Sequence, residues 1–296
     1  MFRKMMFLTT LTIAVLALSA CGANISINPF TAEATVTQSF TAGAPPHMVV
    51  EMFNGSIDVV TGSDNTVKVE VVKRGGGISQ QAAEDDLKNV EVTMTQDGDT
   101  IRVVAKRTDQ RVDIGNSGAS AKLRVPNGAS LDLHSSNGAL TSAGPVSDVK
   151  AKTSNGPIDV RSALGQLDLV TSNGTVTING GSGLINAETS NGPIDVTADN
   201  VTITARTSNG PVSFSGSLAQ GHSQLDTSNG NLVLTLPASA QFALDAETSN
   251  GKINSDFAVS GGTRSDTQLR GTVGSDPGAT LELRTSNSGI DLRQSR

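Results

Sequence analysis

One four-residue motif, Thr-Ser-Asn-Gly, returns throughout most of the chain and restricts its fold more than any other feature. Successive copies lie about 18 residues apart in the centre of the chain and at larger intervals after it, and a fixed period of this size is typical of proteins whose structural repeats stack along one axis. The Asn residues of the copies, the first in the variant Ser-Ser-Asn-Gly and the last in the variant Thr-Ser-Asn-Ser, are Asn137, Asn155, Asn173, Asn191, Asn209, Asn229, Asn250 and Asn287.

Apolar or small residues alternate with polar ones on both sides of the motif. One copy shows the pattern with Leu167, Leu169, Thr171 and Asn173. Because the side chains of a strand point alternately to opposite faces, the pattern predicts half-buried strands. The Asn and Thr of the motif are expected to face the core, and its Ser to face solvent. After most copies the alternation shifts by one residue, which predicts a bend at Asn-Gly with one or both residues at positive φ.

Two arrangements of these strands are compatible with the motif. Asn-Gly between alternating strands is a strong signal for antiparallel hairpins. The constant period instead favours a β-solenoid, in which each strand pairs in parallel with its copy in the next coil, about 4.8 Å away. Buried Asn residues would then hydrogen-bond to one another in a ladder and avoid the cost of about 1–3 kcal/mol for an unpaired buried amide. We therefore expect an all-β, single-stranded parallel β-solenoid, right-handed as most parallel crossovers are.

The repeats divide the rest of the chain. Residues 131–296 contain the regular Asn-Gly coils, each of about 18 residues. The interval from Asn250 to Asn287 is roughly twice as long and predicts two coils with one motif missing. Residues 47–130 are less regular and are expected to form N-terminal coils and a cap. One short helix is predicted there, from Ser79 as N-cap to about Lys88. A separate small α+β domain is the alternative for this region.

The first residues have the properties of an export signal. Arg3 and Lys4 precede a mostly apolar run that is too short for a membrane-spanning helix. The end of this run, Leu18-Ser19-Ala20-Cys21, resembles a bacterial lipoprotein signal. The resemblance implies that residues 1–20 are removed and that Cys21 is lipidated, with palmitate among the acyl chains. An ordinary signal peptide with an incidental cysteine is the alternative.

A lipidated Cys21 would hold the protein on a membrane by its buried acyl chains. Residues 21–46 are then the lipidated cysteine followed by a tether or a loosely docked first strand. In the lipoproteins that the signal resembles, Gly22 is compatible with transport to the outer membrane. In a cell without an outer membrane, the anchor would place the protein on the outer face of the plasma membrane.

Composition argues against several classes of function. The net charge is −6, and the chain has neither Trp nor Tyr, so it is a poor candidate for binding nucleic acid. Cys21 is the only cysteine, which leaves no intrachain disulfide and no cysteine cluster for a metal. The three histidines, His47, His134 and His222, are far apart in sequence and lack the spacing of metal ligands. We expect no metal and no cofactor.

A row of outward carboxylates is the main candidate for chemistry. Asp159, Asp195 and Asp291 each follow the Asn of a repeat by four positions, and Asp58 follows Asn54 of an earlier Asn-Gly, in the first expected coil, by four positions. In a solenoid, Asp159 and Asp195 would be two coils apart, about 9–10 Å, which overlaps the separation of about 6.5–9.5 Å in inverting glycosidases. No aromatic residue is placed beside them to hold a sugar, and calcium would need six or more converging oxygens. The outward Ser column has no His partner for a serine nucleophile, so no catalytic residue is predicted.

A lipoprotein signal followed by tandem Asn-Gly coils resembles the bacterial putative-adhesin domain family, over essentially the whole mature chain. The resemblance implies an envelope-associated β-solenoid and brings no catalytic residues. We therefore expect a non-enzymatic, lipid-anchored protein of the cell envelope that binds a protein or glycan partner. The alternatives are a carbohydrate-active or polysaccharide-binding β-helix protein that uses the Asp row, and a component of an envelope-stress sensor.

The predicted anchor can be tested by replacing the cysteine. Cys21→Ser should move the protein from the membrane fraction to the soluble fraction, because no acyl chain can then be attached. Fractionation and immunoblotting of cells that express either form would measure this. Sedimentation of Cys21→Ser with membranes to the same extent as the unaltered chain would argue against lipidation.

Overall fold

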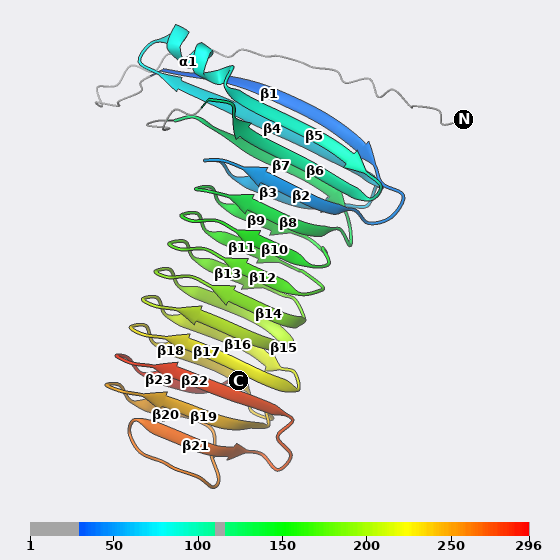
Figure 1. Cartoon of the computed structure of the whole chain (residues 1–296). Helices are drawn as coiled ribbons and strands as arrows, with labels where there is room; N and C mark the ends of the chain where they lie inside the picture. The colour runs from blue at the N-terminus through cyan, green and yellow to red at the C-terminus, as the bar shows by residue number, and fades with distance from the viewer. Residues whose placement is uncertain (1–29, 110–115, 296) are drawn as a thin grey trace.

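The computed structural model describes residues 30–109 and 116–295. This part of the chain is all-β with one short helix, which confirms those two predictions. Its 23 strands belong to one hydrogen-bonded sheet, which coils so that the strands stack in two rows (Figure 1). The predicted signal peptide and Cys21 lie outside the described residues, so their assignment stays a prediction.

Each coil contributes one strand to each row. In order of hydrogen bonding, the first row contains β5 (Val90–Asp97), β6 (Thr100–Arg107), β2 (His47–Met52), β8 (Ser130–Ser135), β10 (Val149–Lys152), β12 (Leu167–Val170), β14 (Gly183–Glu188), the second half of β15 (Ile194–Thr207), β17 (Gly221–Thr227), β22 (Ala279–Thr285), β19 (Phe242–Thr248) and β21 (Gln268–Val273).

The second row is ordered in the same way. It contains β1 (Phe30–Thr41), β4 (Thr66–Gly77), β7 (Gly118–Pro126), β3 (Ile57–Gly62), β9 (Leu140–Ala143), β11 (Ile158–Arg161), β13 (Val176–Asn179), the first half of β15, β16 (Val212–Leu218), β18 (Leu232–Pro237), β23 (Ile290–Ser295) and β20 (Ile253–Ser255). The apolar residues of both rows form one continuous core cluster.

Parallel pairing at the sequence period organises the centre of the stack. In the second row, Ile158 pairs with Val176, Val176 with Ile194, and Ile194 with Val212. Each partner lies one period of the motif further along the chain. The alternative of consecutive antiparallel hairpins does not describe this region. The period therefore sets which residues lie above one another.

Antiparallel pairs occur at both ends of the stack and correct the prediction of a single-stranded, wholly parallel sheet. At the N-terminal end, β1 pairs with β4, β4 with β7, and β5 with β6, and at the other end β19 pairs with β21, all antiparallel. Of these pairs, only β5 and β6 are consecutive strands, which a tight turn can join. The turn between β5 and β6 has Gly98 at φ 57°.

The first and last coils do not lie at the ends of the stack. The coil of β2 and β3 lies between the coil of β6 and β7 and that of β8 and β9. The last coil, of β22 and β23, likewise lies between the coil of β17 and β18 and that of β19 and β20 (Figure 1). The sequence-based expectation of a coil with a missing motif between Asn250 and Asn287 is therefore wrong. Asn287 belongs to a coil inserted ahead of the coil of Asn250.

The predicted helix is present as α1 (Gln80–Leu87), and the hydroxyl of its N-cap residue Ser79 accepts a hydrogen bond from the Ala82 backbone N–H at 3.2 Å. The helix contacts the glycine run at the end of β4 so closely that a Cβ at Gly75 would lie 2.4 Å from the Ala83 carbonyl oxygen. An ion pair of 2.7 Å between Asp86 of the helix and Arg107 of β6 also holds it. No helix in the described part of the chain has the length and apolar character needed to cross a membrane.

At the corner between the rows, the motif Thr faces inward as predicted, and its hydroxyl joins two coils. The Thr171 hydroxyl donates to the Gly156 carbonyl of the preceding coil at 3.0 Å and accepts from the Gly174 backbone N–H at 3.2 Å. The same pair of bonds is made by Thr153, Thr189, Thr207 and Thr227. These buried hydroxyls are thus satisfied only when the coils are stacked.

Two expectations about Asn-Gly are corrected at this corner. The Asn side chains of the motif are exposed and do not point into the core. The motif Gly residues do not adopt positive φ, and of the Asn residues that the structure describes at these corners only Asn54 does, with φ 49°. Gly is required instead by close contact, since a Cβ at Gly174 would lie 1.9 Å from the Gly156 carbonyl oxygen.

This contact predicts a large effect for the smallest substitution. Gly192→Ala should lower the free energy of unfolding by at least about 2 kcal/mol, because its Cβ would lie 1.9 Å from the Gly174 carbonyl oxygen and the coils would have to separate. The matched control is Gly43→Ala, where nothing lies within 4 Å of the added Cβ. Urea denaturation monitored by circular dichroism measures both. Equal midpoints for the two variants would contradict the close-contact account.

Candidate binding face

The exposed corner of the stack carries a continuous series of amide hydrogen bonds. Each Asn Nδ2 donates to the Asn Oδ1 of the neighbouring coil, for example Asn191 to Asn173 at 2.7 Å and Asn209 to Asn191 at 2.7 Å. In spatial order the series contains Asn54, Asn137, Asn155, Asn173, Asn191, Asn209, Asn229, Asn287 and Asn250. All the amides are oriented the same way, so each bond polarises the next.

A column of exposed serines lies beside the Asn series. Their backbones are held from coil to coil, since the Ser154 carbonyl accepts from the backbone N–H groups of both Ser172 and Asn173, at 3.1 and 3.0 Å. The column consists of Ser136, Ser154, Ser172, Ser190, Ser208, Ser228, Ser249 and Ser286. Coil stacking therefore repeats an exposed hydroxyl about every 4.8 Å.

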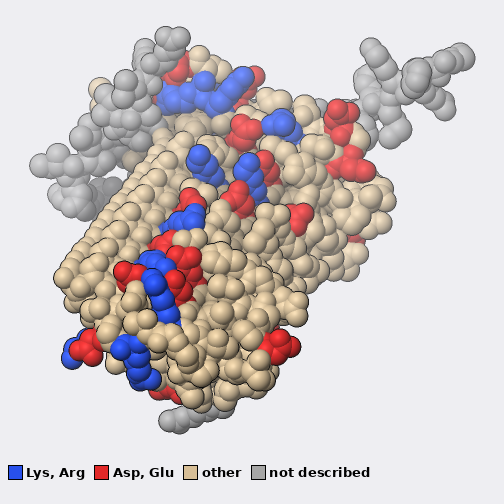
Figure 2. All heavy atoms as spheres, turned by 60° about the horizontal axis from the view of Figure 1, so that its bottom comes forward, with Lys and Arg blue, Asp and Glu red and all other residues tan. Residues whose placement is uncertain are grey.

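Charges of alternating sign form a third column, on the outer face of the first row. Register pairs Glu188 with Arg206, Arg206 with Asp226, Asp226 with Arg284, and Arg284 with Glu247. Cationic and acidic side chains accordingly intermingle in a band on the face shown in Figure 2. Without the inserted coil of Arg284, the carboxylates of Asp226 and Glu247 would face each other, so these charges favour the observed order.

The electrostatic environment differs between two carboxylates of this region. Burial raises the pKa of Asp226 despite the hydrogen bond from Arg206, and its Oδ1 is buried with no hydrogen-bond partner among the described residues. In contrast, hydrogen bonds from Arg284 and Arg270 lower the pKa of Asp245. The distances are 3.0 Å to Arg284 Nη2 and 2.9 Å to Arg270 Nε. Asp245, which lies in β19, thus links its own coil to the inserted coil through Arg284 of β22 and to β21 through Arg270.

A groove runs along the stack between the charged column and the Ser column. Its volume is about 420 Å³, and it is lined by four successive segments, residues 170–172, 188–190, 206–208 and 226–228. Each segment supplies one outward side chain, the buried motif Thr and the exposed motif Ser. The groove is therefore a repeated surface and not a single enclosed pocket.

The Asp row lies elsewhere, on the second row of strands, and its carboxylates do not converge. Asp159 pairs with its neighbour Arg161 at 2.7 Å, and Asp58 accepts from the Thr141 hydroxyl at 2.6 Å. Register places Thr177 between Asp159 and Asp195. This arrangement gives no support to a pair of carboxylates acting on one glycosidic bond.

The histidines are not brought together. His47 Nδ1 lies 2.8 Å from the Ser130 hydroxyl, and His222 Nε2 lies 3.5 Å from Glu282. Across the described ranges, no group of three or more His, Cys, Asp or Glu side chains is arranged to hold a metal ion.

Most of this chain matches the model of a known protein family. Residues 47–293 match the family model described as Toastrack DUF4097. The chain belongs to the Toastrack family. The match confirms the resemblance to the putative-adhesin domain family that the sequence predicts. A search of curated proteins found no match to this Toastrack chain.

Solved structures similar to this Toastrack chain share little of its sequence. A putative adhesin from Bacteroides fragilis is 11% identical, with a TM-score of 0.48 over 87% of this chain and 96% of that one. A putative adhesin from Parabacteroides distasonis is 10% identical, with a TM-score of 0.34 over 88% and 97%. A putative lipid binding protein from the same organism is 13% identical, with a TM-score of 0.31 over 88% and 97%.

The ion pairs of Asp245 predict a pH dependence of stability. Because its pKa is lowered in the folded state, the ionised group stabilises the fold above the unfolded pKa of about 3.8, and this contribution is lost as pH falls through the folded pKa. Asp245→Asn should therefore lower the melting temperature at pH 7 and lessen the further fall on acidification. Asp97→Asn, at an exposed position of β5, is the control. Parallel pH profiles for Asp245→Asn and the unaltered chain would contradict this account.

Proposed function

We propose that this Toastrack chain is a non-enzymatic, lipid-anchored protein of the cell envelope whose coils bind a protein or glycan partner. In this proposal the stack is a right-handed β-solenoid with coils of about 18 residues. Residues 47–130 serve as its irregular N-terminal coils and cap, and residues 131–296 as its regular part. Cys21 is the anchor, on the outer membrane where the cell has one and otherwise on the outer face of the plasma membrane.

The observation that carries the proposal is the groove between the Ser column and the charged column. Four coils present the same hydroxyl at a constant step beside side chains of both charges, Glu188, Arg206 and Asp226. A repeated surface of this kind suits an extended partner, because contacts at one coil are repeated at the next. Donors and acceptors both occur along it, as recognition of hydroxyl-rich glycans or of peptide backbones requires.

The position of the groove fits a protein held at its N-terminal end. Residues 22–29 lie between Cys21 and the first described strand, and even fully extended they reach only about 30 Å. The N-terminal layer of β1, β4 and α1 therefore has to stay near the bilayer. The groove begins several coils further along the stack, at Val170, and so is available to partners away from the membrane.

Capture from an envelope extract tests the proposal. The bait is the purified chain, unaltered or carrying Ser190→Phe, which places a ring in the groove. Ser215→Phe is the matched control, since Ser215 is also an exposed serine but lies in the second row, on β16. We expect Ser190→Phe to lose most of the captured partner and Ser215→Phe to retain it, at unchanged melting temperatures.

Adding soluble glycan fragments of the same envelope as competitors distinguishes the two partner classes. Competition identifies a glycan, and capture that resists it identifies a protein. Equal capture by all three baits would contradict binding at the groove.

A further inference from the structure

The second row contains a pair of like charges that breaks the alternation seen elsewhere. Lys68 of β4 and Arg124 of β7 are direct partners in the antiparallel pairing of these strands, and both are exposed. Like charges directly opposite each other destabilise a sheet. Among the described residues, no carboxylate lies within 4.0 Å of the Lys68 ammonium, and the acidic atom paired with Arg124 is Asp64 Oδ1, 3.9 Å from Nη2.

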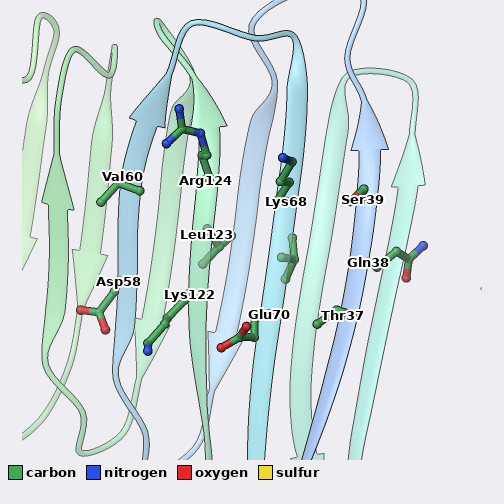
Figure 3. A pocket seen from close by; sticks show the side chains of 11 residues that line it. Thr37, Gln38, Ser39, Asp58, Val60, Lys68, Glu70, Lys122, Leu123 and Arg124 are labelled. Atoms are coloured by element: carbon green, nitrogen blue, oxygen red, sulfur yellow. The ribbon is translucent and has the colours of Figure 1, made fainter. Parts of the chain in front are cut away.

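These cations line a groove of about 440 Å³ that crosses four adjacent strands. One line of outward side chains across it consists of Ser39, Lys68, Arg124 and Val60, according to the register and Figure 3. The next line consists of Thr37, Glu70, Lys122 and Asp58. One end of the groove therefore holds Lys68 and Arg124, with Asp64 at 3.9 Å from Arg124 as their one carboxylate within 4.0 Å among the described residues, and acidic groups flank Lys122 at the other end.

The local backbone gives the arginine room to lie across the neighbouring strand. A Cβ at Gly62 of β3 would lie 2.7 Å from Arg124 Nε and 2.9 Å from its Nη2. Beside it, the Val60 side chain is 47% exposed, an unusual exposure for a large apolar residue in this protein. The groove thus combines a positioned guanidinium, a nearby ammonium and an apolar edge.

We propose that Lys68 and Arg124 bind the phosphate group of a phosphate ester. Arginine and lysine are the side chains that bind phosphate oxygens, and a bound phosphate would remove the repulsion between the two cations. Glu70 and Asp58 exclude a long polyanion, because they would repel a second phosphate along the groove. Val60 offers a contact for the carbon part of the ester.

The phosphate could belong to a phospholipid headgroup or to a soluble ester, and both present the same chemistry to the groove. This site lies in the N-terminal layer, away from the groove beside the Ser column. It goes beyond the proposed function, and either can fail while the other holds.

Titration with glycerol 3-phosphate, followed by calorimetry and phosphorus NMR, tests the site in the purified chain. Lys68→Gln should bind about tenfold more weakly, through loss of one charge-assisted contact, and Lys68→Glu should not bind. Lys152→Gln, at an exposed lysine of the first row, is the control and should bind like the unaltered chain. Without phosphate, Lys68→Glu should also raise the melting temperature, because it places an acidic group opposite Arg124.

Vesicle flotation distinguishes the two sources of phosphate. The chain carries Cys21→Ser so that an acyl anchor does not contribute, and the vesicles are phosphatidylcholine with or without phosphatidylglycerol. Flotation that needs both phosphatidylglycerol and Lys68 identifies a lipid headgroup, and binding of glycerol 3-phosphate without flotation identifies a soluble ester. Failure of both probes to bind, or equal binding by the Lys68→Glu and unaltered chains, would overturn the proposal.

Discussion

The close contact between glycines of successive coils is the constraint on which the rest of the structure depends. At each corner the motif Gly packs directly on the backbone carbonyl of the preceding Gly, and the motif Thr joins the two by accepting from one and donating to the other. A side chain at the Gly would hold the coils too far apart. An apolar residue of the same shape at the Thr would leave a buried backbone group unpaired. The exposed Asn and Ser columns follow from this contact, because it sets the distance at which neighbouring amides can hydrogen-bond.

Because the first and last coils are inserted between other coils, each of them has two hydrogen-bonded neighbours. A terminal coil of an ordinary solenoid has one neighbour and an exposed edge. Here β2 pairs with β6 and β8, and β22 pairs with β17 and β19, so both of these coils are bonded on two sides. The exposed ends are instead antiparallel strands, a short strand and the layer held by α1. The ion pair between Arg284 of the inserted coil and Asp245 of the next coil adds a sequence-specific reason for this order.

The same architecture separates the two surfaces that we propose to bind ligands. Regular coils produce a groove in which the Thr and Ser of the motif are repeated from coil to coil, a property suited to contact with an extended partner. The N-terminal layer breaks the repeat and brings Lys68 and Arg124 together from strands that are far apart in sequence order but adjacent in the sheet. Such a meeting of residues produces a single, local site. In both places the sheet register, and not any loop, positions the side chains.

Much of this structure could be predicted from the sequence because a repeat of constant length determines which residues of neighbouring coils pair with each other. The constant step of the motif and the alternation around Leu167 and Thr171 were enough for an all-β fold with inward threonines, and Ser79 marked the start of the helix. The inward placement of the Asn residues was wrong, and positive φ at Asn-Gly was wrong except at Asn54. A pattern of period two cannot tell at which residue a strand ends and a corner begins. The positions of the first and last coils, and hence the neighbours of Asn287 and Arg284, came only from the tertiary structure. The same holds for the antiparallel pairing that places Lys68 beside Arg124. Repeated motifs determine how one coil lies on another, but they do not determine the order in which the coils stack. That order depends on packing and charge between segments that are far apart in the sequence.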